Sequence, residues 1–227
     1  MKIQAIVPTA GLGKRFQARL PKALVPLQGK PIIARTLKVF EKSSLIDDII
    51  LVAPRKYLSF FKNIVHRYHF RKVKKIVAGD TTRSGSVKKG LNVIDEDTDL
   101  IVVHDGVRPL LNRDTLHKAI KSGKRFGAVV TAVPLKPTIK RVNKKGLVVK
   151  ETLNRDELWE IQTPQVFKKK ILLEAYNRAE GINPTDDAML VEQLGFKVKV
   201  LEGDYKNIKI TTPEDLKIAE IFLKAEK

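Results

Sequence analysis

The N-terminal half of the chain alternates short, near-continuously apolar runs with longer amphipathic stretches. Unbroken apolar runs are typical of strands that helices cover on both faces. A strand–helix–strand order favours parallel pairing, because each helix returns the chain to the start of the next strand. We therefore predict an α/β fold, a Rossmann-like three-layer α/β/α sandwich around a mostly parallel twisted sheet. The predicted strands are Ile3–Pro8, Ile49–Ala53, Val73–Ala78, Leu100–His104 and Ala128–Val133, and the predicted helices are Ile32–Lys42, Tyr57–Tyr68, Arg83–Ile94 and Thr115–Lys124.

The pattern changes after Val133, where two strand-like runs surround a turn that contains Gly146. The runs Thr138–Asn143 and Leu147–Thr152 predict a β-hairpin. Because the hairpin is basic and poor in large apolar side chains, we expect residues 134–156 to project as a β-arm. From Leu158 onward the sequence again has the apolar pattern of a buried core. It predicts helices at Lys168–Glu180 and Asp186–Leu194, a strand at Lys197–Leu201 and a helix from Pro213. Without a convincing linker, residues 1–227 are predicted to form a single domain.

Composition limits the classes of protein to consider. Apolar residues make up 43% and charged residues 30% of the 227 positions, which is typical of a folded, soluble chain. No apolar run approaches the roughly 20 residues that span a bilayer. Met1 and Lys2 lead directly into a strand-like run without a cleavable signal, so we expect a cytoplasmic protein with no membrane partner. The absence of cysteine excludes disulfides and thiolate chemistry.

The net charge of +19 permits binding to nucleic acid, to anionic membranes or to phosphorylated small molecules. Much of the excess lies in Lys62–Lys75 and Lys136–Lys150, which could serve a basic nucleic-acid-binding protein. That hypothesis is disfavoured because aromatic residues make up only 6% of the chain. It would also leave unexplained the three residues Lys22, Asp105 and Lys209, which are discussed below. We therefore expect no nucleic-acid partner.

The most informative motif is the stretch PTAGLGKRFQARLPK, from Pro8 to Lys22. Gly11 and Gly13 follow a strand and would let backbone N–H groups approach phosphate oxygens. The stretch is not a Walker A motif, and a dinucleotide fingerprint would need glycine where Phe16 stands. A surface turn with incidental cations explains the glycines alone equally well.

A second motif, Val-His-Asp-Gly-Val-Arg-Pro, ends the predicted fourth strand. Asp105 would lie at the carboxyl edge of the sheet, where such folds bind ligands, and could hold Mg²⁺. The alternative is that Asp105 caps a turn and pairs with Arg108 at the surface. Near the C-terminus, Thr212 and Pro213 predict the start of a helix. Lys209, which we place on a strand before that helix, is a candidate phosphate-binding cation.

A third motif, Gly-Asp-Thr-Thr-Arg-Ser-Gly-Ser-Val, begins at Gly79, between a predicted strand and a predicted helix. Its small residues and hydroxyl groups would suit recognition of a planar base through backbone groups and a serine. Ordinary capping of the helix by Thr82 or Ser84 is the alternative, and both interpretations can hold together.

Taken together, the motifs resemble a known family. The pattern A-G-x-G-x-R, followed by the Pro-Lys pair at Lys22, resembles the sugar nucleotidyltransferase superfamily. With Leu153–Arg155, Gln162–Gln165 and Pro184–Asp187 added, the chain resembles the cytidylyltransferases of isoprenoid biosynthesis that act on 2-C-methyl-D-erythritol 4-phosphate. The resemblance covers essentially the whole chain. It implies a nucleotidyltransferase-type fold and transfer of a cytidylyl group from CTP to that acceptor, with release of pyrophosphate.

The resemblance also implies roles for single residues. It gives Arg15, Lys22 and Lys209 as catalytic cations. It gives as CTP-binding residues Pro8, Thr9, Ala10, Gly11, Leu12, Gly13, Lys14, Gly79, Asp80, Ser86, Asp105 and Gly106. It gives as sugar-phosphate-binding residues Arg108, Thr138, Arg155, Thr163, Thr185 and Asp186. Asp105 would also bind Mg²⁺, with Mn²⁺ as a substitute, and a homodimer would form through the arm because Arg155 reaches a neighbouring subunit.

The chain departs from the family pattern at a few positions. Asp80 stands where members often have a second glycine, so its carboxylate should turn away from the base. Val107 stands where alanine is common, and valine occurs in ribitol-phosphate cytidylyltransferases. Ribitol 5-phosphate therefore remains an alternative acceptor, and a nucleotidyltransferase that uses UTP is a more distant alternative. Lys206 replaces a position that is often acidic, which weakens any expectation of a second metal carboxylate there.

Overall fold

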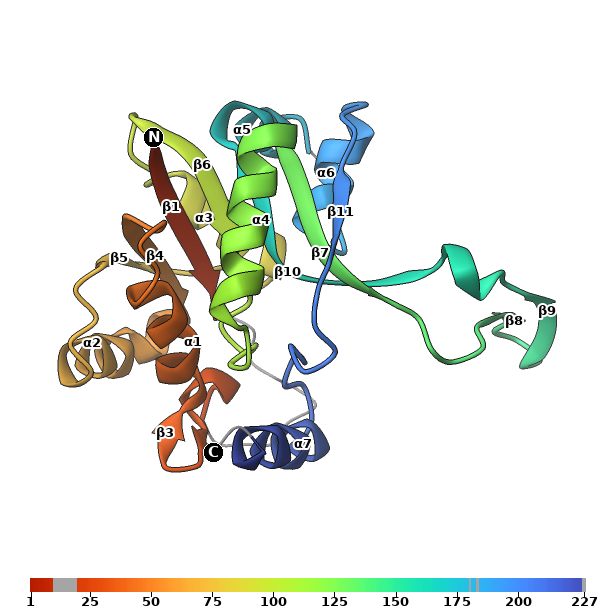
Figure 1. The fold of residues 1–227 in the computed structure, drawn as a ribbon, viewed down its shortest axis with the longest axis horizontal. Helices are drawn as coiled ribbons and strands as arrows, with labels where there is room; N and C mark the ends of the chain where they lie inside the picture. The colour runs from red at the N-terminus through yellow and green to blue at the C-terminus, as the bar shows by residue number, and fades with distance from the viewer. Residues whose placement is uncertain (10–19, 180, 183, 226–227) are drawn as a thin grey trace.

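The computed structural model describes residues 1–9, 20–179, 181–182 and 184–225. Within these residues the central sheet has seven strands in the order β11-β7-β10-β6-β1-β4-β5 (Figure 1). Every neighbouring pair is parallel except the two pairs that include β10, which confirms a mostly parallel sheet. The strands are β1 (Lys2–Pro8), β4 (Asp48–Ala53), β5 (Val73–Ala78), β6 (Thr98–Val103), β7 (Ala128–Pro134), β10 (Trp159–Lys168) and β11 (Lys199–Glu202).

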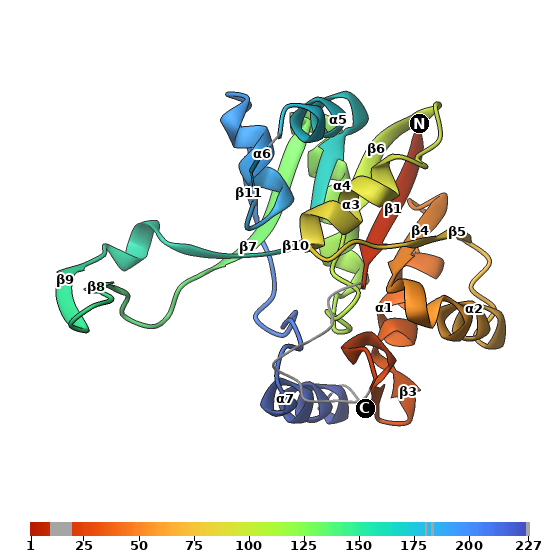
Figure 2. The same cartoon turned by 180° about the vertical axis from the view of Figure 1, so that it is seen from behind.

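Helices cover both faces of this sheet (Figures 1 and 2). Successive strand residues point to opposite faces. In β1, Ala5 and Val7 therefore join one buried cluster and Ile6 joins another, so the whole run is apolar. The first cluster includes α1 (Ile32–Glu41), α2 (Leu58–Arg67) and α4 (Arg113–Phe126), and the second includes α3 (Arg83–Leu91), α5 (Lys169–Asn177) and α6 (Asp187–Gln193). The predicted three-layer sandwich is confirmed.

The C-terminal helix, α7 (Pro213–Lys224), begins as the sequence predicts. The Thr212 side chain accepts from the Asp215 amide, and the Asp215 side chain accepts from the Thr212 amide, so the helix has a capping box. The helix packs on the short hairpin of β2 (Pro26–Leu27) and β3 (Lys30–Pro31). This packing holds the segment before α7 close to the chain that follows residue 20.

One central strand, β10, was not predicted. It lies between β7 and β6 and runs antiparallel to both. Its pairing with β7 is interrupted between Ile161 and Gln165, around the cis peptide bond that joins Thr163 to Pro164. Proline has no N–H for a ladder and usually marks an edge strand, so the sequence argued against a central strand here. The interruption leaves polar side chains of β10 at the carboxyl edge of β6.

The predicted hairpin forms and extends from the body of the molecule (Figure 1). Its strands are β8 (Lys140–Asn143) and β9 (Val148–Thr152), in which every residue is exposed. A backbone hydrogen bond from Leu135 to Leu158 joins the two chain segments at the root. Among the described residues, no helix combines the length and apolar character needed to cross a membrane.

Candidate active site

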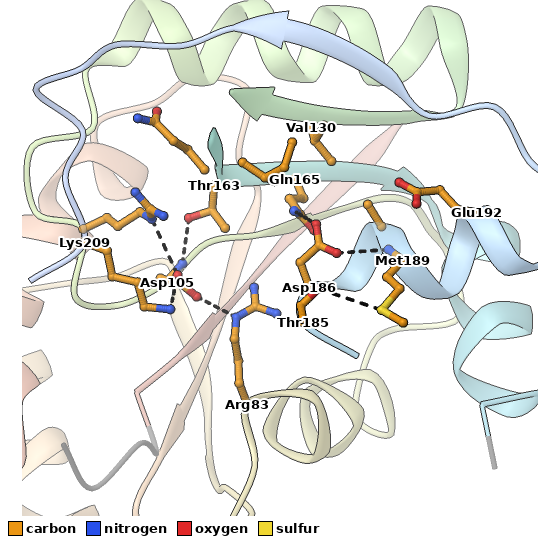
Figure 3. A pocket seen from close by; sticks show the side chains of 14 residues that line it. Arg83, Asp105, Val130, Thr163, Gln165, Thr185, Asp186, Met189, Glu192 and Lys209 are labelled. Atoms are coloured by element: carbon orange, nitrogen blue, oxygen red, sulfur yellow. Dashed lines mark hydrogen bonds and ion pairs between the residues drawn. The ribbon is translucent and has the colours of Figure 1, made fainter. Parts of the chain in front are cut away.

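Two adjoining cavities lie where the carboxyl ends of β1 and β6 meet β10 and α6. The larger, of about 420 Å³, extends toward α6, and the smaller, of about 100 Å³, extends toward the end of β1. Arg83, Asp105 and Lys209 line both cavities. Figure 3 shows the larger cavity, with these three side chains grouped on one side of it. The carboxyl edge of the sheet is therefore the candidate site, as the fold class predicts.

Asp105 follows β6 and is 5% exposed. Its Oδ1 lies 2.7 Å from Arg83 Nε, and its Oδ2 lies 2.9 Å from Lys209 Nζ and 3.6 Å from Arg108 Nε. Burial alone would raise the pKa of the carboxyl group, but the three cations outweigh it and hold the pKa well below its usual range. Asp105 is therefore ionised in a buried cluster. The alternative correctly paired Asp105 with Arg108 across a turn, but the pair is buried and not at the surface.

A buried hydrogen-bond chain fixes the backbone of Asp105. Its N–H donates to Thr163 Oγ1 at 3.1 Å, and that hydroxyl lies 2.9 Å from His104 Nδ1. His104 Nε2 lies 3.1 Å from the carbonyl oxygen of Arg108, which can only accept. Nε2 must therefore carry the proton, and Nδ1 accepts from the Thr163 hydroxyl. Burial lowers the pKa of His104 to about 4, so the ring is neutral at physiological pH.

Arg108 is buried at the wall of the larger cavity. Its Nη1 donates to the carbonyl oxygen of Asn207 at 2.7 Å, whereas its Nε is buried without a hydrogen-bond acceptor. Burial lowers the pKa of Arg108, but an arginine keeps its charge in proteins. Nε instead forms the 3.6 Å ion pair with Asp105 Oδ2. The cationic wall that Arg108 adds to the cavity favours an anion as the occupant.

The opposite wall of the larger cavity comes from the start of α6. Asp186 caps this helix by accepting from the Met189 amide, and it also accepts from Gln165 Nε2 at 2.6 Å. Thr185 is exposed and lines the same wall. Of the predicted acceptor-binding residues, Arg108, Thr163, Thr185 and Asp186 are thus brought together around one cavity.

The smaller cavity is lined by the end of β1 and by lysines from distant segments. The Thr9 hydroxyl donates to the carbonyl oxygen of Val52, and Gly106 packs so closely on Thr9 that a Cβ atom would overlap its side chain. Lys22 and Lys209 both line this cavity, and Lys22 Nζ donates to the carbonyl oxygen of Ile210 at 3.2 Å. The structure therefore brings together Lys22, Asp105 and Lys209, as expected for a phosphate site.

Ser86, in the first turn of α3, lines the smaller cavity, whereas Gly79 and Asp80 belong to the loop between β5 and α3 and are not among its lining residues. The Asp80 carboxylate accepts from the Thr81 amide at 2.6 Å, which lowers the pKa of Asp80 and turns the carboxylate toward its own loop. The Ser86 hydroxyl donates to the carbonyl oxygen of Thr82 and accepts from the Asp80 amide. Thr82 also caps α3, so the alternative of helix capping holds here as well.

Some predicted residues lie elsewhere. Thr138 and Arg155 belong to the arm, where Arg155 donates to the carbonyl oxygen of Lys136, and neither is among the residues that line the two cavities of the site. Lys209 lies in an extended connection, and not on a strand as predicted, although the next residue, Ile210, donates its N–H to the Val107 carbonyl. The predicted residues Ala10, Gly11, Leu12, Gly13, Lys14 and Arg15 lie outside the described residues.

Sequence reasoning missed Arg83 and Asp187. Arg83 lies at the first position of α3, where the positive end of the helix dipole disfavours a cation. That conflict is a signal that could have identified it. Asp187 is fully buried beside it, and Tyr176 donates its hydroxyl to that carboxylate. The only sequence sign of Asp187 was its place next to Asp186.

The described residues contain no group of three or more histidine, aspartate or glutamate side chains arranged to hold a metal ion. Asp105 nevertheless offers a hard carboxylate beside the cationic pockets. Mg²⁺ commonly takes one or two carboxylates and completes its shell with water and substrate phosphates. The Lys209 side chain is 38% exposed, so it can move away from Asp105 Oδ2 and leave that oxygen to such an ion. The donor set fits a magnesium ion that arrives with a phosphate.

Comparisons with known proteins agree with this geometry. A family model described as 2-C-methyl-D-erythritol 4-phosphate cytidylyltransferase matches residues 3–225. A protein of that name from Alkaliphilus metalliredigens is 46% identical over 100% of this chain and 95% of its own length. Another, from Caldanaerobacter subterraneus subsp. tengcongensis, is 40% identical over 99% of this chain and 100% of its own length. The crystal structure of 4-diphosphocytidyl-2C-methyl-D-erythritol synthase from Anaerococcus prevotii is similar, with a TM-score of 0.86, 35% identity and 98% coverage of both chains.

Proposed function

The chain belongs to the family of 2-C-methyl-D-erythritol 4-phosphate cytidylyltransferases, and on this premise we propose that its two adjoining cavities are the two substrate subsites. The enzyme transfers a cytidylyl group from CTP to 2-C-methyl-D-erythritol 4-phosphate, a step of the non-mevalonate isoprenoid pathway. The products are 4-diphosphocytidyl-2-C-methyl-D-erythritol and pyrophosphate. One observation carries the proposal: both cavities open onto the same ionised Asp105 and the same Lys209.

The smaller cavity is the subsite for the CTP phosphates. Lys22 and Lys209 supply cations there. Pro8, the last residue of β1, also lines this cavity. We assign Arg15 and residues 10–14 to the same phosphates on the family pattern alone. The loop from Gly79 to Ser86 borders the cytosine, which suits a planar group because Asp80 is turned to its own backbone. CTP would thus lie across the ends of β1 and β5.

The larger cavity is the subsite for the acceptor. The buried Arg108, which lines this cavity, supplies a cation for the acceptor phosphate. Thr185 and Asp186 offer oxygen atoms to the hydroxyl groups of the sugar alcohol. Thr163 lines this cavity too, although its hydroxyl is engaged with His104 and the Asp105 amide.

The chemistry follows from the charges. An acceptor phosphate is already ionised at neutral pH, so its oxygen attacks the α-phosphorus of CTP without a general base. A new phosphorus–oxygen bond forms as the bond between the α-phosphorus and the oxygen bridging to the β-phosphate breaks, and pyrophosphate leaves. The difficulty is bringing two anions together and stabilising the pentacoordinate charge, which the cations achieve by positioning and electrostatics. This explains why the described residues of the site are rich in cations.

Mg²⁺, which Mn²⁺ could replace, would be held by Asp105 and would neutralise charge on the CTP phosphates when bound. Lys209, whose Nζ lies 2.9 Å from Asp105 Oδ2 and whose side chain is 38% exposed, would face the phosphate oxygens beside that carboxylate. Both substrates are small phosphorylated molecules. We therefore infer a cytoplasmic enzyme without a nucleic-acid or membrane partner.

We further propose that two copies of the chain form a homodimer through the arm, residues 134–156. An isolated two-stranded hairpin is only marginally stable in water. The arm and its root expose several large apolar side chains, among them Leu147, which is 82% exposed, and Val148, which is 63% exposed. A second copy would bury these side chains and would receive Thr138 and Arg155 beside its acceptor subsite.

The subsite assignment is tested by substituting one cation in each cavity. Lys22→Gln should weaken CTP binding and reduce turnover by about 100-fold. Arg108→Gln should leave CTP binding within about threefold of the wild type and raise the KM for the acceptor by about 10-fold or more. Calorimetry with CTP alone, followed by steady-state kinetics, separates the two effects. Equal losses of CTP affinity in both variants would contradict the division into two subsites.

A further inference from the structure

Arg83 and Asp187 form an ion pair to which the proposed mechanism gives no role; Asp187 is fully buried, and the Arg83 side chain is 24% exposed. Each is the first residue of its helix, α3 or α6, on the same face of the sheet. Arg83 Nη1 lies 2.8 Å from Asp187 Oδ2. Tyr176 of α5 donates its hydroxyl to Asp187 Oδ1 at 2.5 Å. Oδ1 of this carboxylate is thus held by a hydrogen bond, whereas Oδ2 is held by the ion pair with Arg83 and accepts no hydrogen bond.

Local stability does not explain the pair. Thr82 already caps α3, and the first turn of α3 contains no acidic residue that would favour a cation there. The helix dipole opposes a positive charge at this end. Burying two charges as a pair is, in general, no more stabilising than packing apolar side chains of the same volume. A positional role accounts better for the arrangement.

The guanidinium of Arg83 connects Asp187 to the active site. While Nη1 contacts Asp187, Nε contacts Asp105 Oδ1 at 2.7 Å, so one planar group spans two carboxylates. Figure 3 shows this side chain rising between Asp105 and the start of α6. With Oδ1 held, Oδ2 is the oxygen that faces Lys209. The contact therefore fixes the rotation of the Asp105 carboxylate.

We infer that Arg83, held in place by Asp187 and Tyr176, is the positioning residue that orients the Asp105 carboxylate where the two subsites meet. This inference rests on the proposed function for the identity of the substrates. A lysine at position 83 would keep the charge but, as a point donor on a flexible stem, could not hold both carboxylates in one geometry. Arg83→Lys is therefore the informative variant.

For Arg83→Lys we expect kcat to fall by about 10- to 100-fold while the KM for the acceptor changes by less than about threefold. Asp187→Asn should lower kcat by about 10-fold. The double variant R83K/D187N should lose no more than Arg83→Lys alone, because Asp187 acts through Arg83. Losses that multiply in the double variant, or an Arg83→Lys enzyme that keeps wild-type kcat, would overturn the inference.

A second readout does not depend on turnover. Calorimetry with CTP alone, with and without Mn²⁺, measures how far the metal strengthens CTP binding. We expect that gain to shrink by about 10-fold in Arg83→Lys, because a misoriented Asp105 is a poorer ligand. An unchanged gain would count against the inference even if kcat fell.

The controls separate positioning from folding and from the proposed function. Arg178→Gln breaks an exposed pair with Glu174 on the C-terminal side of α5 and should leave all readouts unchanged. If Arg83→Lys does not fold, the variant R83Q/D187N, which leaves no unpaired buried charge, carries the same expectations. Wild-type turnover with CTP and 2-C-methyl-D-erythritol 4-phosphate tests the proposed function by itself. Metal-dependent CTP binding remains measurable whatever that assay gives.

Discussion

At the scale of single residues, the site depends on charges that are buried but paired. Asp105 stays ionised because three cations outweigh the effect of burial. His104 is linked to the Asp105 amide by two hydrogen bonds through the Thr163 hydroxyl. Its ring stays neutral because burial lowers its pKa. The neutral ring lets Nδ1 accept from Thr163, which in turn receives the Asp105 amide. The protonation state of one buried histidine therefore supports the backbone that carries the Asp105 carboxylate.

The pKa of His104 predicts a specific acid sensitivity. Because the folded-state value of about 4 lies below the ordinary value of 6.5, its contribution to stability is complete above pH 6.5 and is lost as the pH falls toward 4. The loss amounts to about 3 kcal/mol. His104→Gln, which does not titrate, should show a flatter fall in unfolding free energy over this range. Urea unfolding of both proteins at several pH values measures it, and parallel curves would refute the prediction.

At the scale of elements, close packing of helices on the sheet positions the residues that line the two cavities. Gly90 of α3 lies so close to β1 that an added Cβ atom would be 2.7 Å from Ile6 Cγ2. Ile6 is fully buried in the central strand and is stiff at χ1, so it has little room to move. Close packing at this point sets the height of α3, and hence of Arg83 and Ser86, above the carboxyl edge.

Gly90→Ala should therefore destabilise the protein by about 1–3 kcal/mol through overpacking, although alanine favours a helix by up to about 1 kcal/mol. Lys88→Ala, an exposed substitution on the same helix, is the matched control and should be neutral or slightly stabilising. Chemical unfolding gives both values. A Gly90→Ala protein as stable as the control would show that α3 can shift without cost.

Elements could be predicted from the sequence where their pattern was strong. Continuous apolar runs identified the parallel strands, and the Thr212–Pro213 pair identified the start of α7. The central strand β10 was missed because its middle residues, Gln162 to Gln165, are polar and include a proline. Those polar residues are buried, and they line the larger cavity. Their polar sequence therefore does not predict the buried strand in which they lie. Arg83 was missed for the same reason, because its partners Asp105 and Asp187 come from distant segments.

At the scale of the whole molecule, the arm carries two of the predicted acceptor-binding residues away from the cavities of its own chain. Thr138 and Arg155 can contribute only if a second copy receives them. The proposed homodimer therefore predicts that each active site is shared, with Lys22 from one subunit and Arg155 from the other.

Mixing two inactive proteins tests this sharing. Lys22→Gln and Arg155→Gln homodimers should each turn over about 100-fold more slowly than the wild type. A heterodimer contains one site with both substitutions and one with neither, so activity should recover to at most half of the wild-type value. Tagged subunits, separated after exchange, give the heterodimer. A purified heterodimer as inactive as its parents would refute sharing between subunits.

The central claim is that the two cavities join CTP to 2-C-methyl-D-erythritol 4-phosphate, and its most direct test is pyrophosphate release from CTP by the purified protein with Mg²⁺. The reaction is run with that acceptor, with ribitol 5-phosphate and with no acceptor, and again with UTP in place of CTP. We expect rapid release only when CTP and 2-C-methyl-D-erythritol 4-phosphate are both present, with loss of activity in Lys22→Gln. Faster release with ribitol 5-phosphate, or release that does not depend on an acceptor, would contradict it.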